Sequence, residues 1–254
     1  MITLLAVYTS SFSWGSSNDI PPSNSNLTSL LKNDSIRTEA KSQFMYYAQD
    51  FYYELGDTAL NYQAFSEALV GYHNLIKYDK LQRQAVLTVI DFSKPSSAER
   101  CYIIDVCNRK ILHKTIVAHG VNSGRLFARH FSNDDNSHES SLGFYVTTTT
   151  YHGKYKLALR LDGVDHSNSH ASSRGVVMHG ADYATYEFLE KNGGTLGRSY
   201  GCPAMPHENF EQVVEWIKGG SCLYIYHPNR SYHRYSRYLN RSNYLEDFLW
   251  FARS

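Results

Sequence analysis

The sequence predicts an α+β protein in which a helical hairpin precedes a mainly β domain. From residue 37 to about residue 78, apolar residues recur three or four positions apart, which is the spacing of one helical face. From Val86 onward the pattern changes to short β-rich runs separated by polar turns. Hydrophobic residues make up 42% of the 254, which is enough for the core of one domain of moderate size with an appendage.

Two helices are expected in the hairpin, which we place at residues 37–80. The first covers residues 37–55 and ends at Gly56-Asp57, and the second begins after Asn61, a good N-cap residue. Their apolar faces consist of Ala40, Phe44, Tyr47, Phe51 and Leu55 in the first helix and Phe65, Leu69, Tyr72 and Ile76 in the second. We expect the two helices to pack together in a structural role rather than a catalytic one.

The mainly β domain is expected at residues 81–228. Its predicted strands are residues 86–92, 102–106, 111–118, 146–151, 157–161 and 222–226. Turns at Asn108-Arg109 and at Gly153-Lys154 would join two pairs of these strands as hairpins. No internal repeat and no linker divides this region into two large domains.

The two ends of the chain differ in character from the domain. Residues 1–36 predict a flexible leader, because residues 10–25 are rich in serine, glycine, proline and asparagine. The apolar start is short and has no positive residue before it, so it is at most a degenerate signal segment. Residues 229–254 form a basic, aromatic tail, which we expect to be solvated or packed on the domain rather than bound to a membrane or an anionic wall polymer.

Charge and cysteine content exclude several classes of protein. The chain has 25 basic and 24 acidic residues, so no overall field favours nucleic acid, and no run is long enough to cross a membrane. Cys101 and Cys107 belong to one extended segment and cannot bridge without bending it. We therefore expect free thiols and no nucleic-acid or membrane partner.

A histidine and a cysteine stand in unusual settings between residues 175 and 206. An apolar run at residues 176–178 leads into His179-Gly180, which places the imidazole at a strand end. Cys202 lies between Gly201 and Pro203, and a helix predicted at residues 207–218 would follow it closely. A thiol near a helix start and an imidazole is readily deprotonated, so the pair predicts a nucleophile and its base, although a buried structural cysteine is the simpler alternative.

These residues carry a resemblance to a known family. The runs Val-Val-Met-His-Gly-Ala-Asp-Tyr at 176–183 and Leu-Gly-Arg-Ser-Tyr-Gly-Cys-Pro-Ala at 196–204 resemble the active-site signature of murein L,D-transpeptidases of the YkuD-like type, in a divergent subgroup with a Ser-x-Gly-Cys-Pro-Ala ending. The resemblance extends from about residue 59 to about residue 226 and implies a β-sandwich or barrel. Tyr200 stands where the wider family has a second histidine, and Pro203-Ala204 replaces an aliphatic residue and an arginine.

The resemblance implies a role for each residue of the signature. Cys202 would be the nucleophile and His179 the base, with the main-chain carbonyl of Gly180 orienting the imidazole. The amides of Gly201 and Cys202 would face the developing oxyanion. Three further expectations complete the site: a carboxylate-binding guanidinium at Arg198, a hydroxyl that polarises the site or shapes the turn at Ser199, and a stacking or sealing ring at Tyr200. No cofactor and no metal is expected, although His166, His170 and His179 would be the ligands of a rival zinc site.

The implied activity is acyl transfer on peptidoglycan stem peptides through a thioester, which would make the chain a carbapenem target. Such a substrate implies an extracytoplasmic location, most simply a bacterial periplasm. Water in place of an amine acceptor would make the same site an L,D-carboxypeptidase. The departures at Tyr200 and Pro203 also allow a wall-binding module that has lost turnover. The choice of acceptor, the third stem residue and the oligomeric state stay open at this point.

Overall fold

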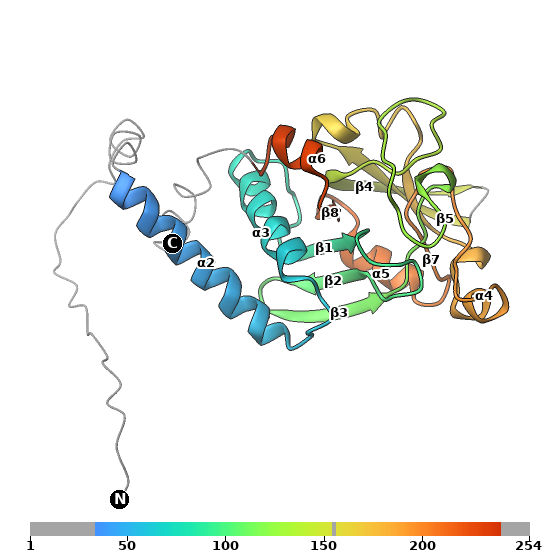
Figure 1. Cartoon of the computed structure of the whole chain (residues 1–254), viewed down its shortest axis with the longest axis horizontal. Helices are drawn as coiled ribbons and strands as arrows, with labels where there is room; N and C mark the ends of the chain where they lie inside the picture. Colours follow the sequence, from blue (N-terminus) through green and yellow to red (C-terminus); the bar gives the residue numbers. More distant parts are fainter. Residues whose placement is uncertain (1–33, 154–155, 240–254) are drawn as a thin grey trace, which may run out of the picture.

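The computed structural model describes residues 34–153 and 156–239 (Figure 1). Helices α2 (Asp34–Leu55) and α3 (Tyr62–Lys77) confirm the predicted hairpin. The Asn61 side chain accepts a hydrogen bond from the Gln63 amide at 2.9 Å, so it caps α3 as expected. The ring of Phe51 meets that of Phe65 edge to face, with centroids 5.2 Å apart, and this contact joins the two apolar faces. The side chain of Ala40 lies outside the described residues.

The strands form one eight-stranded sheet in the order β3-β2-β1-β8-β4-β5-β6-β7. Two neighbouring pairs are parallel, β1 with β8 and β6 with β7, and the others are antiparallel. The strand bounds are β1 (Val86–Asp91), β2 (Cys101–Asp105), β3 (Lys110–Thr115), β4 (Gly143–Gly153), β5 (Lys156–Gly163), β6 (Val177–Gly180), β7 (Ala204–Met205) and β8 (Cys222–Tyr226).

Both predicted hairpins are present, one with a shifted turn. Strands β2 and β3 pair across a turn in which Arg109 takes a left-handed φ of 49°. Between β4 and β5 the register pairs Gly153 with Lys156, so Gly153 belongs to the strand and the connection is residues 154–155 rather than Gly153-Lys154. Gly153 can extend the ladder because a glycine adopts strand dihedrals as readily as turn dihedrals.

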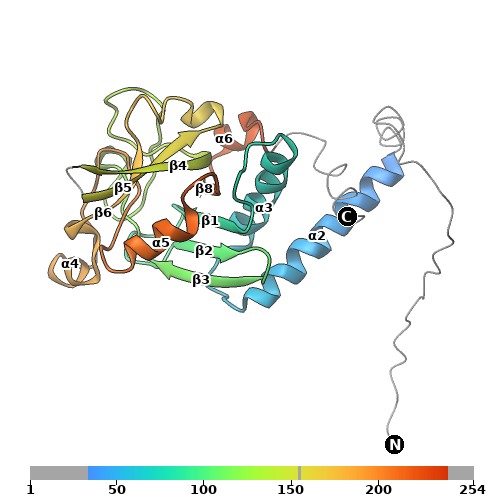
Figure 2. The ribbon, with the colours of Figure 1, turned by 180° about the vertical axis from the view of Figure 1, so that it is seen from behind.

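Two helices cover opposite faces of the β1–β2–β8 region, as Figures 1 and 2 show from the front and from behind. Helix α3 lies on one face, and α5 (Phe210–Ile217) lies on the other. At Gly71 of α3, an added Cβ would lie 1.9 Å from a ring atom of Phe144, so glycine allows the helix to approach β4. The remaining helices are α4 (Tyr186–Lys191) and α6 (Arg230–Tyr235), with 3₁₀ turns at η1 (Val121–Ser123), η2 (His166–Asn168) and η3 (Asp182–Ala184).

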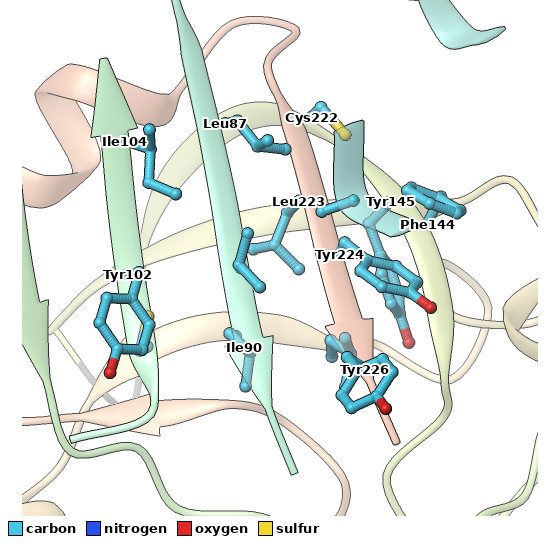
Figure 3. Close-up of a cluster of buried hydrophobic side chains, with 14 of the residues drawn as sticks. Leu87, Ile90, Tyr102, Ile104, Phe144, Tyr145, Cys222, Leu223, Tyr224 and Tyr226 are labelled. Carbon is cyan, nitrogen blue, oxygen red and sulfur yellow. The ribbon is translucent and has the colours of Figure 1, made fainter. Parts of the chain in front are cut away.

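The main core packs on both faces of the central strands, against α3 and against α5 (Figure 3). Leu87 and Ile90 from β1 and Leu223 from β8 are fully or almost fully buried there. The rings of Phe144 and Tyr224 stack with centroids 4.2 Å apart. Each buried side chain of this size contributes about 1.5–3 kcal/mol relative to an exposed one, so this region supplies a large part of the folding free energy.

The two edges of the sheet approach each other after β3. The Ala118 amide donates to the Ala204 carbonyl at 2.7 Å, and the Ser199 amide donates to the His119 carbonyl at 3.0 Å. Residues 118–120 therefore bridge toward β7 at the opposite edge and almost close the sheet into a barrel. The predicted mainly β domain of sandwich or barrel type with an N-terminal helical hairpin is confirmed.

The segment after β8 packs on the domain as far as it is described. The Asp165 carboxylate accepts hydrogen bonds from Tyr232 Oη at 3.0 Å, from Ser236 Oγ at 3.2 Å and from the Arg237 amide at 3.1 Å. Asn74 of α3 donates to the Tyr238 carbonyl at 2.6 Å. These buried contacts fix residues 229–239 against η2 and α3, while residues 240–254 lie outside the described part. No helix in the described residues is long and apolar enough to cross a membrane.

Candidate active site

Strands β6 and β7 bring the predicted histidine and cysteine to one place. His179 of β6 pairs with Ala204 of β7 in parallel, so Cys202, two residues before Ala204, lies beside Val177. The Val177 amide donates to Cys202 Sγ at 3.5 Å, which confirms this alignment. The thiol and the imidazole therefore belong to adjacent, paired chain segments, and Cys202 is aligned with the residue two positions before His179. His179 is 1% exposed and Cys202 is partly accessible to solvent.

The His179 ring is held by a main-chain carbonyl, as expected. Its Nδ1 lies 2.9 Å from the Gly180 carbonyl oxygen, and because a carbonyl only accepts, Nδ1 carries the proton. The Nε2 lone pair is then the basic position. Burial lowers the pKa of His179, while the Gly180 hydrogen bond opposes the shift and the charge of His207 adds to it. The imidazole is therefore neutral at neutral pH and able to accept a proton.

The Cys202 thiol is protonated at rest. Burial raises its pKa, against the lowering effects of the Val177 amide, the Arg174 charge and its own amide. The predicted helix start after Cys202 is wrong: α5 begins at Phe210, and β7 and a turn at Asn209, with a left-handed φ of 62°, intervene. The Ala204-Met205 segment joins the sheet as β7 instead, so Cys202 does not lie at the start of α5. Because the pKa of the thiol is raised, a base is required to form the thiolate.

The turn that carries the nucleophile is held by the Ser199 hydroxyl. Ser199 Oγ donates to the Cys202 carbonyl at 2.6 Å and accepts from the Gly201 amide at 3.0 Å. Gly201 has a φ of 120°, and a Cβ there would lie 2.8 Å from the Glu139 carbonyl oxygen, so only glycine fits. Ser199 thus shapes the turn, and the Gly201 amide faces Ser199 Oγ in this structure.

A second serine, absent from the sequence prediction, supports the same turn. Ser140 Oγ donates to the Gly201 carbonyl at 3.0 Å and accepts from the Gly120 amide at 3.0 Å, while the Ser140 amide donates to Ser123 Oγ at 2.8 Å. All of these groups are buried. This small network joins three segments that are distant in the sequence, residues 120–123, Ser140 and Gly201, at the turn before Cys202. The geometry of the turn is therefore fixed before any substrate binds.

Two arginines lie near the site with different orientations. Arg174 donates to the carbonyls of Ser132 and Glu139 at 2.8 Å each and to the hydroxyls of Ser141 and Ser137 at 2.6 and 3.0 Å. Its charge lowers the pKa of Cys202. Arg174 was not among the residues predicted from the sequence, although it directly precedes Gly175 and the histidine strand.

Arg198, the predicted carboxylate-binding residue, is directed elsewhere. Its guanidinium donates a hydrogen bond to the Gly124 carbonyl at 3.5 Å. Its charge also lowers the pKa of His119. His119 is buried, and burial followed by the charge of Arg100 lowers its pKa to about 3. Arg100 donates to His119 Nδ1 at 2.8 Å, so the imidazole is neutral and its Nε2 faces the Gly124 carbonyl. The hydrogen bond from Arg100 therefore holds His119, whose carbonyl accepts from the Ser199 amide, in place.

Tyr200 is 71% exposed and stacks on His138, with ring centroids 4.3 Å apart at 24°. Both rings line an open cavity of about 420 Å³, together with Arg174, Ser173, Asn136 and Asp135. We call it the Tyr200 cavity. Tyr200 is two residues before Cys202 in the sequence, and a Cβ added to Gly201 would lie 3.4 Å from Arg174 Nη2, so the cavity lies beside the turn that carries Cys202.

The imidazole of a second histidine, His207, lies beside β6. A Cβ added to Gly180 would lie 2.4 Å from His207 Nδ1, and His207 Nε2 is 3.3 Å from an oxygen of Asp182. His207 thus faces the main chain of Gly180, which orients His179. From the sequence, His207 was predicted only as the first residue of a helix, which in fact begins three residues later.

The rival zinc site is not assembled. Within residues 34–153 and 156–239, no group of three or more histidine, cysteine, aspartate or glutamate side chains could hold a metal ion. His166 and His170 lie at η2, where His170 Nδ1 contacts the Asn133 carbonyl at 3.1 Å, whereas His179 lies in β6. All four cysteines are free thiols.

With this geometry established, comparison with known proteins identifies the family. Residues 57–226 match the L,D-transpeptidase catalytic domain. The chain belongs to this family. Its members act on peptidoglycan, and the match includes α3, the whole sheet and the segment with His179 and Cys202. No curated protein matches the chain in sequence.

Solved structures of L,D-transpeptidases are similar to this chain. The Mycobacterium smegmatis enzyme has 12% identity and a TM-score of 0.37, covering 56% of this chain and 59% of that one. The Mycobacterium tuberculosis H37Rv enzyme has 15% identity and a TM-score of 0.37, covering 56% and 58%. The Stackebrandtia nassauensis enzyme has 11% identity and a TM-score of 0.35, covering 71% and 76%. This chain thus spans less than two thirds of the two mycobacterial enzymes.

Proposed function

We propose that this L,D-transpeptidase is catalytically active and transfers an acyl group from a peptidoglycan stem peptide through a thioester on Cys202. The observation that carries the proposal is the placement of a partly accessible thiol beside β6, two residues in register from an imidazole whose Nδ1 is fixed by the Gly180 carbonyl. This is the arrangement that nucleophilic catalysis by a protonated thiol requires. The substrate implies an extracytoplasmic site of action, most simply a bacterial periplasm.

In the first half-reaction His179 acts as the base. Nε2 accepts the thiol proton of Cys202, and the sulfur forms a bond to the carbonyl carbon between the third residue and the terminal D-alanine of the donor stem. The tetrahedral intermediate collapses when the C–N bond breaks. The His179 imidazolium returns the proton to the leaving amine, and the acyl group remains on sulfur. A neutral resting imidazole and a protonated resting thiol are the required starting states.

The second half-reaction uses the same residues in reverse. An amine from another stem, or water, loses a proton to His179 and attacks the thioester carbon. The C–S bond then breaks, and the His179 imidazolium returns the proton to the Cys202 thiolate. Transfer to an amine forms a crosslink, whereas attack by water gives L,D-carboxypeptidase activity. The open, 71% exposed surface at Tyr200 leaves room for either acceptor.

The developing oxyanion needs hydrogen-bond donors, and the substrate carboxylate needs a positive charge near it. We assign the oxyanion to the Cys202 amide, because the Gly201 amide faces Ser199 Oγ and shapes the turn. We assign the electrostatic attraction of anionic stem peptides to Arg174, which lines the Tyr200 cavity but whose Nη–H donors already bond to Ser132, Ser141, Ser137 and Glu139. A guanidinium beside the thiol would both favour the thiolate and draw a carboxylate toward it. A direct hydrogen bond to the substrate carboxylate is assigned to the exposed Arg198, whose guanidinium makes one long contact of 3.5 Å with the Gly124 carbonyl.

The decisive experiment combines purified muropeptides with mass spectrometry. Disaccharide-tetrapeptides incubated with the enzyme should yield a covalent acyl adduct, followed by crosslinked or trimmed products. A carbapenem should form a stable adduct with the wild type. Cys202→Ala should form none of these, whereas Cys107→Ala, which removes an exposed free thiol, should behave as the wild type.

The possible outcomes separate the three candidate activities. Crosslinked dimers indicate transpeptidation, and tripeptides alone indicate carboxypeptidation. Binding of muropeptides without any adduct on Cys202 would replace the proposal with a wall-binding module. An adduct that persists in Cys202→Ala would reject Cys202 as the nucleophile.

A further inference from the structure

A second cavity lies apart from the nucleophile, between residues 131–134, η2 and α6. Its volume is about 410 Å³. Side chains of Asn133, His166, His170, Asn229 and Tyr235 contribute to its lining. We call it the Tyr235 cavity. None of these residues takes part in the acyl-transfer chemistry described above.

The lining is suited to a neutral, hydroxyl-rich ligand. It combines serine hydroxyls, carboxamides and imidazoles with aromatic rings, and among the described residues that form it, Asp134 is the one aspartate, glutamate, lysine or arginine. Without a lysine or arginine there, a phosphate or another anion would gain no ion pair. Tyr235 is 64% exposed, so its ring offers an apolar face on which the C–H groups of a sugar ring can pack. These are the features by which proteins bind saccharides.

The cavity wall is fixed before any ligand arrives. Asn133 Nδ2 donates to Ser169 Oγ at 3.0 Å and to the His166 carbonyl at 3.1 Å, and Asn133 Oδ1 accepts from the His170 amide at 3.0 Å. On the opposite wall, the buried Asp165 holds Tyr232 and with it α6. A preformed wall lowers the ordering cost of binding.

Successive parts of the same two chain segments line the Tyr235 cavity and the Tyr200 cavity. Residues 131–134, 166, 167, 169 and 170 line the first, and residues 135, 136, 138, 173 and 174 line the second. Arg174 joins them, because its guanidinium donates to the Ser132 carbonyl and to Ser137 Oγ. A ligand that follows these segments would pass from one cavity to the other and reach the nucleophile.

We propose that the Tyr235 cavity binds the glycan part of peptidoglycan, as an N-acetylated amino sugar, while the stem peptide attached to that glycan occupies the Tyr200 cavity. Only the placement of the stem peptide in the Tyr200 cavity rests on the proposed function. Sugar binding to the Tyr235 cavity is measurable without turnover. It assigns α6 a role in substrate selection: the enzyme recognises a stem peptide that is still attached to its sugar.

The direct test measures binding to Cys202→Ala, which holds no acyl group. Amide chemical shifts are followed by NMR during titration with a peptide-free N-acetylglucosamine–N-acetylmuramic acid disaccharide whose lactyl carboxyl is converted to the amide, so that the probe is neutral as the glycan is in peptidoglycan. We expect saturable shifts at residues 131–134, 166–170 and 229–236. Adding Tyr235→Ala should weaken binding about tenfold, and adding Ser231→Trp, which fills the cavity from an exposed lining position, should abolish it. The matched control Tyr46→Ala removes a 70% exposed tyrosine on α2 and should change nothing.

A kinetic test connects the cavity to catalysis. The wild type should use the disaccharide-tetrapeptide with a higher kcat/KM than the free tetrapeptide, and Tyr235→Ala should lower only the former, by about tenfold through KM. Thermal unfolding of each variant identifies a folding defect. Absence of disaccharide shifts, or equal binding by all variants, would overturn the inference. If sugar binding is found but no turnover occurs, the proposed function fails and the glycan site stands.

Discussion

His179 lies within a paired strand, whereas Cys202 lies in an irregular turn just before one. The base is positioned by regular main-chain pairing and by the carbonyl of its own neighbour, Gly180. The nucleophile is positioned by hydroxyl contacts from Ser199 and by Ser140, which belongs to a distant segment. The base thus depends on local structure and the nucleophile on tertiary structure. Variants of the two regions should therefore fail in different ways.

The largest effect is expected from the base. His179→Ala removes the proton acceptor, so acylation by a carbapenem should slow by about a hundredfold or more, while the fold remains intact. Stopped-flow fluorescence or time-resolved mass spectrometry measures the rate. His152→Ala, which removes an exposed histidine of β4, is the control and should retain the wild-type rate. An unchanged rate in His179→Ala would remove this histidine from the mechanism.

The difference between the two regions also explains what the sequence could predict. The helical hairpin and most of the strands follow from apolar periodicity, which is a local signal. The histidine strand could be recognised in the same way, from three apolar residues followed by His179-Gly180. The family resemblance was carried by two runs, residues 176–183 and 196–204, and it predicts His179 and Cys202 as the reacting groups.

The parts that were missed depend on contacts between distant segments. Arg174 and Ser140 are ordinary surface residue types in the sequence, and only folding brings them to the turn at Gly201. The helix after Cys202 was predicted three residues too early, because the left-handed Asn209 breaks a pattern that composition alone favours. Arg198 was chosen for its position in the motif, yet its guanidinium is directed to Gly124. Sequence spacing does not encode such side-chain directions.

The next largest effect is expected from the nucleophile turn. Ser199→Ala removes the donor to the Cys202 carbonyl and the acceptor of the Gly201 amide, so the sulfur should lose its fixed position. Acylation should slow about tenfold, and unfolding free energy should fall by about 1–3 kcal/mol because buried polar groups lose their partner. Chemical denaturation and adduct formation measure the two effects. Ser97→Ala, at an exposed position, is the control.

If Ser199→Ala affects only stability, the turn keeps its geometry through Ser140 alone. A double variant, Ser199→Ala with Ser140→Ala, then tests the network as a unit. A loss of activity much greater than the product of the single effects would indicate that the two hydroxyls compensate for each other.

A smaller effect, seen mainly as a pH shift, is expected from Arg174. Its positive charge lowers the pKa of Cys202, so Arg174→Met should raise that pKa and move the alkaline rise in thiol reactivity to higher pH. Arg174→Lys keeps the charge but loses the forked hydrogen bonds, and should preserve the profile better. Rates of alkylation by iodoacetamide against pH measure this. Arg198→Met should leave the profile unchanged, and an equal shift in both variants would reassign the electrostatic role.

The smallest effect is expected from His207, which acts on the base rather than on the nucleophile. The neutral form of His179 is the active one, and its lowered pKa places the acid limb of the rate profile below pH 6.5, the ordinary histidine value. The charge of His207 contributes to this lowering, so His207→Leu should raise the pKa of His179 and move the acid limb to higher pH. The rate above pH 7.5 should not change, because His179 is neutral there in both proteins. A loss of rate at all pH values would instead indicate that His207 supports the Gly180 carbonyl sterically, since the two groups are in close contact. The base would then depend on tertiary packing as the nucleophile does.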